Sequence, residues 1–163
     1  MSELQASSQA RGDRVVRALV RRSPGSRIAA GFVGTTHLDI VPAVGAVDDA
    51  GAMLQVQDAG GLALSRDRVR AMRDVAWLGV RPEHWLMTPG AGADGLHARI
   101  ERVEASGEFT LVHCRLHGAD SVAVTVRTAW PGAEALPRGL RVRLEVRPWD
   151  LVLFDAEGRA LAL

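Results

Sequence analysis

Histidine and cysteine gather in one short stretch of the chain, His113-Cys114-Arg115-Leu116-His117, and a further histidine, His97, precedes it. Imidazole and thiolate are ligands that zinc prefers, so this stretch is the first candidate for a metal site. On a strand, His113 and His117 share a face but lie about 13 Å apart. Zinc holds each nitrogen at about 2.0–2.1 Å, so these two cannot bind one ion on an unbroken strand, and no metal site is expected. Cys114 points to the opposite face and is expected to be a small buried hydrophobic residue.

The segment Gly90-Ala91-Gly92-Ala93-Asp94-Gly95 matches the letters of the dinucleotide motif G-x-G-x-x-G. That motif works after a strand and at the start of a helix, where backbone amides meet the pyrophosphate. Here Pro89 precedes the glycines and an alternating segment follows them, which predicts a loop that binds no nucleotide.

All 20 basic residues are Arg, because the sequence contains no Lys. A Walker A loop needs a Lys for the β- and γ-phosphates, and a Schiff-base enzyme needs one as nucleophile, so both chemistries are excluded within this chain. The sequence also shows no recognisable Ser-His-Asp or Cys-His arrangement for nucleophilic catalysis. We therefore predict no catalytic residue and no cofactor.

The 163 residues are enough for one domain with a core and a short appendage, and the net charge of +1 does not indicate a nucleic-acid partner. The single cysteine excludes an intrachain disulfide. No apolar run approaches the roughly 18 residues of a membrane span, and the N-terminus lacks the apolar segment of a signal peptide. These features predict a cytoplasmic location.

The chain divides into two regions. Residues 1–12 are small and polar and are expected to be a disordered leader. Asp13 is expected to cap a short basic helix over residues 14–22. Residues 1–25 therefore form the predicted leader and helix, and residues 26–163 the predicted domain.

Within that domain, turn signals rich in Gly and Pro separate short runs in which apolar residues alternate with polar ones. Residues 140–147 alternate in this way. Residues 96–103 do so too, and the period of two places one set on each face: Leu96, Ala98, Ile100 and Arg102 against His97, Arg99, Glu101 and Val103. Short antiparallel strands with such turns are typical of an all-β fold, a small barrel or sandwich.

The segment Leu78-Gly79-Val80-Arg81-Pro82-Glu83-His84 interrupts this pattern. Pro82 has no backbone donor, so a strand must leave its ladder or lie at an edge here. Arg81 and Glu83 are two apart on what we expect to be an extended segment, where they would share a face and could fix a neighbouring loop. The alternative is an edge strand with a surface ion pair.

Four stretches in order resemble the C-terminal regulatory region of ATP-binding subunits in bacterial ABC importers of the carbohydrate and glycerol-phosphate type. They are residues 21–34, 78–84, 98–116 and 140–161, of which the Leu-Gly-Val-Arg-Pro-Glu-His segment at 78–84 is the most specific. The resemblance implies a transport-associated OB-type (TOBE) fold that packs beside an ATPase domain. No Walker A, signature or Walker B motif precedes Arg21, so this chain alone is expected neither to bind nor to hydrolyse ATP.

The resemblance also implies a function. It is that of a non-catalytic regulatory and dimerisation domain, which acts by protein contacts at the inner face of the cell membrane and meets the membrane only through the transporter. The expected partners are an ABC transporter ATPase subunit or domain and a second copy of the chain. Arg81, Pro82, Glu83 and His84 would form a structural corner, and Ile28, Phe32 and Val33 a partner-facing junction. The alternatives are a stand-alone OB-type module that binds a small ligand or oxyanion, and an enzyme with an unrecognised site.

Overall fold

The computed structural model describes residues 38–49, 51–65, 69–118 and 122–161. The predicted leader and helix, and the predicted junction residues Ile28, Phe32 and Val33, lie outside the described residues. None of the helices in the described ranges combines the length and apolar character that a membrane crossing requires.

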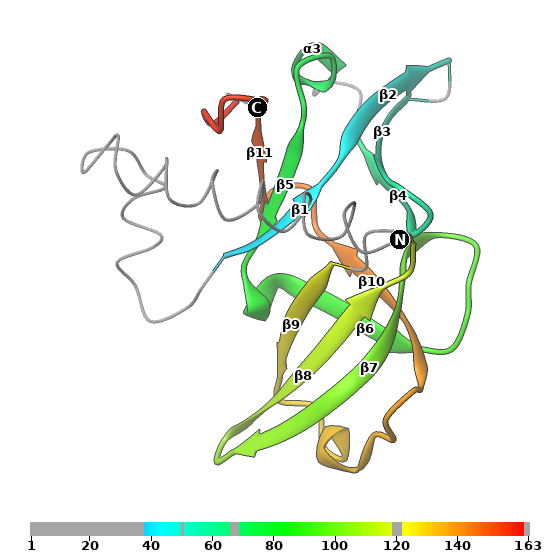
Figure 1. The fold of residues 1–163 in the computed structure, drawn as a ribbon, viewed down its shortest axis with the longest axis vertical. Coiled ribbons are helices and arrows are strands. Elements are labelled where there is room, and N and C mark those ends of the chain that lie inside the picture. Colours follow the sequence, from blue (N-terminus) through cyan, green and yellow to red (C-terminus); the bar gives the residue numbers. More distant parts are fainter. Residues whose placement is uncertain (1–37, 50, 66–68, 119–121, 162–163) are drawn as a thin grey trace, which may run out of the picture.

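The described chain forms two antiparallel sheets (Figure 1). The smaller sheet has the order β1-β5-β11, with β1 at Asp39–Pro42, β5 at Trp77–Val80 and β11 at Leu151–Phe154. The larger sheet runs β2-β3-β4-β7-β10-β6, with β8 paired to β7 and β9 paired to β8. Its strands are β2 (Val44–Asp48), β3 (Gly51–Val56), β4 (Gly60–Leu64), β6 (Trp85–Pro89), β7 (Gly95–Ser106), β8 (Phe109–Leu116), β9 (Ala123–Thr128) and β10 (Arg141–Val146).

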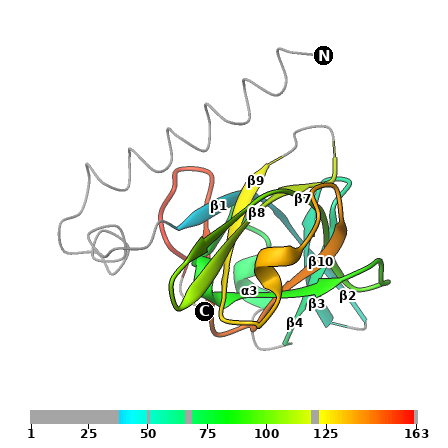
Figure 2. The same cartoon turned by 90° about the horizontal axis from the view of Figure 1, so that it is seen from below.

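In the described ranges, three short helices join the strands: α3 (Val69–Met72), the 3₁₀ helix η2 (Pro82–His84) and the 3₁₀ helix η3 (Ala133–Ala135). Figure 1 places α3 at the upper end, beside β2 and β3, and β7, β8 and β9 side by side in the lower half. The view from below in Figure 2 shows η3 across the lower end of these strands. The predicted all-β class of short antiparallel strands is confirmed.

The alternation of buried and exposed side chains accounts for the position of most of the strands. In β8 every second residue is buried, and β3 and β10 show the same period in their burial. A period of two turns one row of side chains to the interior and the other to the surface. The polar members of these runs therefore cover the outside of the larger sheet.

The prediction of unbroken alternation through residues 96–103 is wrong after Ile100. Ile100 pairs with Cys114, but the next pair is Arg102 with His113, so β7 carries one extra residue, Glu101. Such a β-bulge moves every later residue to the other face. Arg102, expected on the same face as Ile100, is accordingly exposed.

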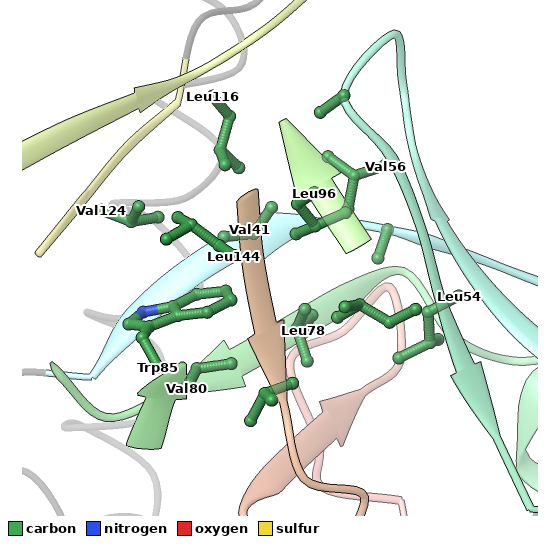
Figure 3. Close-up of a cluster of buried hydrophobic side chains, with 14 of the residues drawn as sticks. Val41, Leu54, Val56, Leu78, Val80, Trp85, Leu96, Leu116, Val124 and Leu144 are labelled. Carbon is green, nitrogen blue, oxygen red and sulfur yellow. The ribbon is translucent and has the colours of Figure 1, made fainter. Parts of the chain in front are cut away.

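One apolar core joins the two sheets. Leu78 and Val80 of the smaller sheet pack in the same cluster as Leu54, Leu96 and Leu144 of the larger one (Figure 3). The other face of the smaller sheet is buried too, because Trp77 and Phe154 form a second cluster there with Leu38, Ile40, Ala76 and Val152. All four residues of β5 are therefore buried, as expected of a central strand covered on both faces.

Candidate functional site

The segment with the Arg-Pro-Glu motif connects the two sheets. β5 ends at Val80 in the smaller sheet, η2 follows, and β6 begins at Trp85 in the larger sheet. The prediction of an extended segment through Glu83 is wrong, because Pro82–His84 form a 3₁₀ turn, closed by the bond from the His84 backbone amide to the Arg81 carbonyl at 2.9 Å. Proline suits the first helical position, since its fixed φ matches and its missing N–H would have no partner there.

Polar contacts of two residues, His84 and Trp85, hold this segment to distant parts of the chain. His84 Nδ1 lies 3.2 Å from the carbonyl oxygen of Asp150, and its Nε2 lies 3.9 Å from the Asp150 carboxylate. The indole Nε1 of the buried Trp85 donates to Asp39 Oδ2 at 2.9 Å. The backbone amide of Thr125 donates to the same oxygen, also at 2.9 Å.

Asp39 thereby performs a role that the sequence analysis missed. β6 pairs only with β10 and β9 only with β8, so within the described strands no hydrogen-bond ladder joins β6 to β9. Trp85 belongs to β6 and Thr125 to β9, and Asp39 of β1 binds both. The Asp39 side chain therefore links β6 to β9, two strands that no backbone hydrogen-bond ladder joins in the described part of the chain.

Replacing Arg81 by Ala is expected to change the free energy of unfolding by no more than about 0.5 kcal/mol. Arg81 is exposed at the start of η2, whereas Pro82 is buried. Urea unfolding of the variant and of the parent protein measures the difference. A loss above about 1 kcal/mol would show that Arg81 has a buried partner.

The histidine–cysteine stretch lies on β8 as far as Leu116, with His117 just after the strand, and its side chains make separate contacts. His113 Nδ1 lies 3.3 Å from Thr125 Oγ1, and its Nε2 lies 3.4 Å from the Glu104 carboxylate. The rings of His97 and His117 are 6.3 Å apart between centroids. Within the described residues, no three His, Cys, Asp or Glu side chains come close enough to hold a metal ion.

The thiol of Cys114 is expected not to react with alkylating reagents in the folded protein. Cys114 is fully buried, as the alternation predicts. Burial, followed by the nearby charges of Asp39 and Glu101, raises the pKa of the thiol from 9.0 to about 12. Since the thiolate is the reactive form, mass spectrometry should find labelling only after denaturation. Rapid labelling of the native protein would contradict this environment.

Asp155 organises the turn after β11. Its Oδ1 accepts hydrogen bonds from the backbone amides of Glu157 at 3.0 Å and Arg159 at 2.8 Å, and its Oδ2 accepts one from Arg159 Nε at 2.7 Å. Burial by itself would raise the pKa of this carboxyl, but the bonds from Arg159 and Glu157 outweigh it and lower the pKa below the usual 3.8. An aspartate whose side chain accepts hydrogen bonds from backbone amides just after it is typical of such turns, and Gly158 lies in this one.

This lowered pKa predicts that the Asp155 contribution to stability is present above pH 3.8 and is lost as the pH falls below that value. The sign follows because the unfolded chain takes up the proton at a higher pH than the folded one. Unfolding midpoints of the parent protein should fall over this acidic range, and Asp155→Asn should show a shallower fall. Equal pH dependence in both proteins would contradict the assignment.

A groove on the outer face of the larger sheet is the main feature that the sequence did not predict. Its volume is about 570 Å³, and its walls come from β7, β8, the β3–β4 turn and the loop before β10. Arginine dominates the lining, with Arg99, Arg115 and Arg138 around it, and Glu101 binds one of them. Arg115 Nε and one terminal nitrogen contact the two Glu101 oxygens at 2.6 and 3.0 Å.

Part of the chain matches a known protein family. Residues 78–154, from β5 through β11, match the TOBE domain family. The chain carries a TOBE domain. This match includes the Arg-Pro-Glu segment and most of the arginine groove. It contains the stretches 78–84 and 98–116 and most of 140–161, and the resemblance to this family is confirmed.

Two curated relatives extend the similarity beyond the TOBE domain. The chain is 37% identical over 144 residues to the sn-glycerol-3-phosphate import ATP-binding protein UgpC of Cereibacter sphaeroides, covering 85% of this chain and 36% of the relative. It is 30% identical over 137 residues to the protein of the same name from Chromohalobacter salexigens, covering 83% and 35%. The chain thus spans about a third of the length of these relatives.

Among solved structures, the cytoplasmic molybdate-binding protein ModG aligns with 72% of this chain and 94% of its own, at a TM-score of 0.46 and 12% identity.

Proposed function

We propose that the TOBE domain of this chain is a non-catalytic regulatory and dimerisation domain of an ABC transporter ATP-binding subunit in carbohydrate or glycerol-phosphate import. The observation that carries the proposal is the alignment of 85% of the chain with an import ATP-binding protein. The domain acts by protein contacts, beside the ATPase part and at the inner face of the cell membrane. It supplies no catalytic residue to ATP hydrolysis.

The edge of the larger sheet is a surface suited to such contacts. β2 is the terminal strand of the larger sheet, so among the described strands it has a neighbour on one side only. Val44, Val47 and Met53 are exposed along β2 and β3, with 66%, 47% and 40% of their surface accessible. The run Val44-Gly45-Ala46-Val47 carries none of the charges or prolines that usually protect an edge.

Sedimentation velocity tests the proposal directly. The purified chain is measured alone and then mixed with a full-length ATP-binding subunit from the same source. A homodimer or a mixed complex is the expected result. A folded monomer that does not bind the subunit would contradict the protein-contact role.

A charged variant tests whether the β2 edge is the contact. Val44→Glu places a carboxylate on this edge and should weaken the association at least about tenfold, because a charge buried without a partner is costly. Leu86→Glu is the matched control, since Leu86 is also partly exposed, at 42%, but lies on β6 at the other end of the sheet. Equal weakening by both variants would argue against this edge.

The corner role of Arg81, Pro82, Glu83 and His84 belongs to the same proposal. We infer that the segment sets how the two sheets are joined, since η2 lies between strands of different sheets and His84 contacts Asp150. His84→Ala should therefore destabilise the domain more than Arg81→Ala does.

A further inference from the structure

The strands that end the two sheets differ in how their outer sides are occupied. β6 and β9 each pair on one side only, but Asp39 of β1 accepts hydrogen bonds from both and links all three strands. The chain after β11 folds back onto that strand, since Leu161 N–H donates to the Leu153 carbonyl at 2.9 Å. β2 pairs with β3 over its whole length, and no described strand pairs with its other side.

β2 is held firmly on the side of the core. Gly45 lies opposite the buried Leu54 and so faces the interior, where a Cβ atom at this position would collide with the Met72 carbonyl at the end of α3. Val44 and Ala46 therefore face outward. Figure 1 shows β2 and β3 at the upper right, away from β7, β8 and β9. Because β3 and α3 already fix the strand, pairing at its free side needs little further ordering.

The outer face beside this edge is apolar. Ala46 of β2 lies opposite Met53 of β3, which lies opposite Ala63 of β4, and all three are exposed or half-buried. The neighbouring row across the same strands is Val44, Gln55 and Gly61. Neither row contains a charged side chain, and both end at the free side of β2. A further strand at this edge would extend both rows.

The sequence of β2 is compatible with pairing to itself. Antiparallel pairing of two copies centred on Ala46 overlaps all five residues and opposes Val44 to Asp48, Gly45 to Val47 and Ala46 to Ala46. No like charges are opposed in this arrangement. The Asp48 carboxylate accepts a hydrogen bond from the Gly51 amide at 3.0 Å, within its own β2–β3 turn. The row of Ala46, Met53 and Ala63 would continue into the same row of the second copy.

We propose that two copies of this chain associate by antiparallel pairing of their β2 strands, centred on Ala46, so that one continuous sheet crosses a twofold axis. Such an interface uses the same surface on both copies, and the main-chain hydrogen bonds of the added strand supply affinity. The proposal rests on the dimerisation role proposed above and names its partner strand and register.

Disulfide trapping tests the register. At the twofold axis Ala46 lies opposite itself, and opposed Cα atoms in antiparallel strands are about 4.5–5.5 Å apart, within the range of about 4.4–6.8 Å that disulfides span. Ala46→Cys should therefore form a disulfide-linked dimer under mild oxidation. The parent chain should form none, because its single cysteine, Cys114, is fully buried.

Val44→Cys is the matched control. Val44 lies on the same strand and the same face, and at 66% exposure it is more accessible than the half-buried Ala46. In the proposed register the two Val44 positions are four residues apart along the paired strands, about 13 Å. Cross-linking of Val44→Cys should therefore be at least about tenfold slower than that of Ala46→Cys. An equal or faster rate would overturn the register, since random collision favours the more exposed thiol.

Hydrogen exchange of the parent protein tests the pairing without a substitution. Every second residue of an edge strand directs its amide away from the sheet, so these amides of β2 should exchange more slowly at high than at low protein concentration. Amides of β9, which also pairs with one strand only, should show no such dependence. Exchange in β2 that does not depend on concentration would overturn the pairing.

Sedimentation of the parent protein separates this proposal from the broader role. A dimer whose Ala46→Cys variant forms no disulfide overturns the β2 pairing and leaves dimerisation standing. A monomer that binds only the ATP-binding subunit also overturns the pairing and leaves the protein-contact role standing. Reduced Ala46→Cys should melt at the temperature of the parent protein, which shows that the variant is folded before it is oxidised.

Discussion

Leu78→Ala is expected to lower the free energy of unfolding by about 2–5 kcal/mol, a large share of the about 5–15 kcal/mol that a domain possesses. Leu78 is fully buried and lies on the central strand of the smaller sheet, where its side chain packs in the cluster that also holds the core of the larger sheet. Truncation leaves a cavity at the junction between the sheets (Figure 3). Urea denaturation monitored by tryptophan fluorescence and by circular dichroism measures the loss.

The shared core also predicts that the two sheets unfold together. Both probes should follow one transition in the parent protein and in the variant, because Leu78 and Leu144 belong to one cluster. Leu86→Ala is the control, since Leu86 is 42% exposed on β6 and should cost under about 1 kcal/mol. Separate transitions for the two probes would show that the sheets are independent units.

Asp39→Ala is expected to cost about 2–4 kcal/mol, because it leaves two donors without their acceptor. These donors are the indole of the buried Trp85 and the backbone amide of Thr125, each 2.9 Å from the same carboxylate oxygen. We expect the loss of stability to be greatest at the contact between β6 and β9, because no hydrogen-bond ladder joins these two strands in the described part of the chain. Hydrogen exchange should show faster exchange at the Thr125 amide than elsewhere in β9.

Two variants separate this role from a general effect of charge. Asp39→Asn keeps a side-chain oxygen that can accept the same bonds, so it should lose less stability than Asp39→Ala. Asp74→Ala removes an exposed carboxylate far from this contact and should stay within about 0.5 kcal/mol of the parent protein. Equal losses in Asp39→Ala and Asp74→Ala would show that Asp39 does not bridge the strands.

Local pattern accounts for much of what was predicted correctly. A period of two in the sequence indicated half-buried strands such as β8 and β10, and the same period placed Cys114 in the core. Such statements depend only on which residues are neighbours along the chain, since each side chain in a strand points opposite to the next. The prediction failed where backbone geometry changed locally, at the bulge around Glu101 and at the 3₁₀ turn of Pro82–His84.

The resemblance to importer ATP-binding subunits could also be recognised from the sequence. The Leu-Gly-Val-Arg-Pro-Glu-His segment and the strands after it lie within the residues that match the TOBE domain family. The absence of Lys by itself excluded a Walker A loop in this chain. The order of the motifs therefore indicated the domain family, and the alternation of side chains indicated the all-β fold.

Which distant residues come into contact depends on how the whole chain folds. Asp39 lies 46 residues from Trp85 and 86 residues from Thr125, and no local pattern relates them. Arg141, Arg99 and Arg115 lie side by side because of the register of β10, β7 and β8, and a shift of one residue would turn each side chain to the other face. Register is set by the packing of the whole core and not by the strands taken singly. For this reason the kind of fold could be predicted from the sequence. The arginine-lined groove and the contacts of Asp39 with Trp85 and Thr125 could be found only in the folded structure.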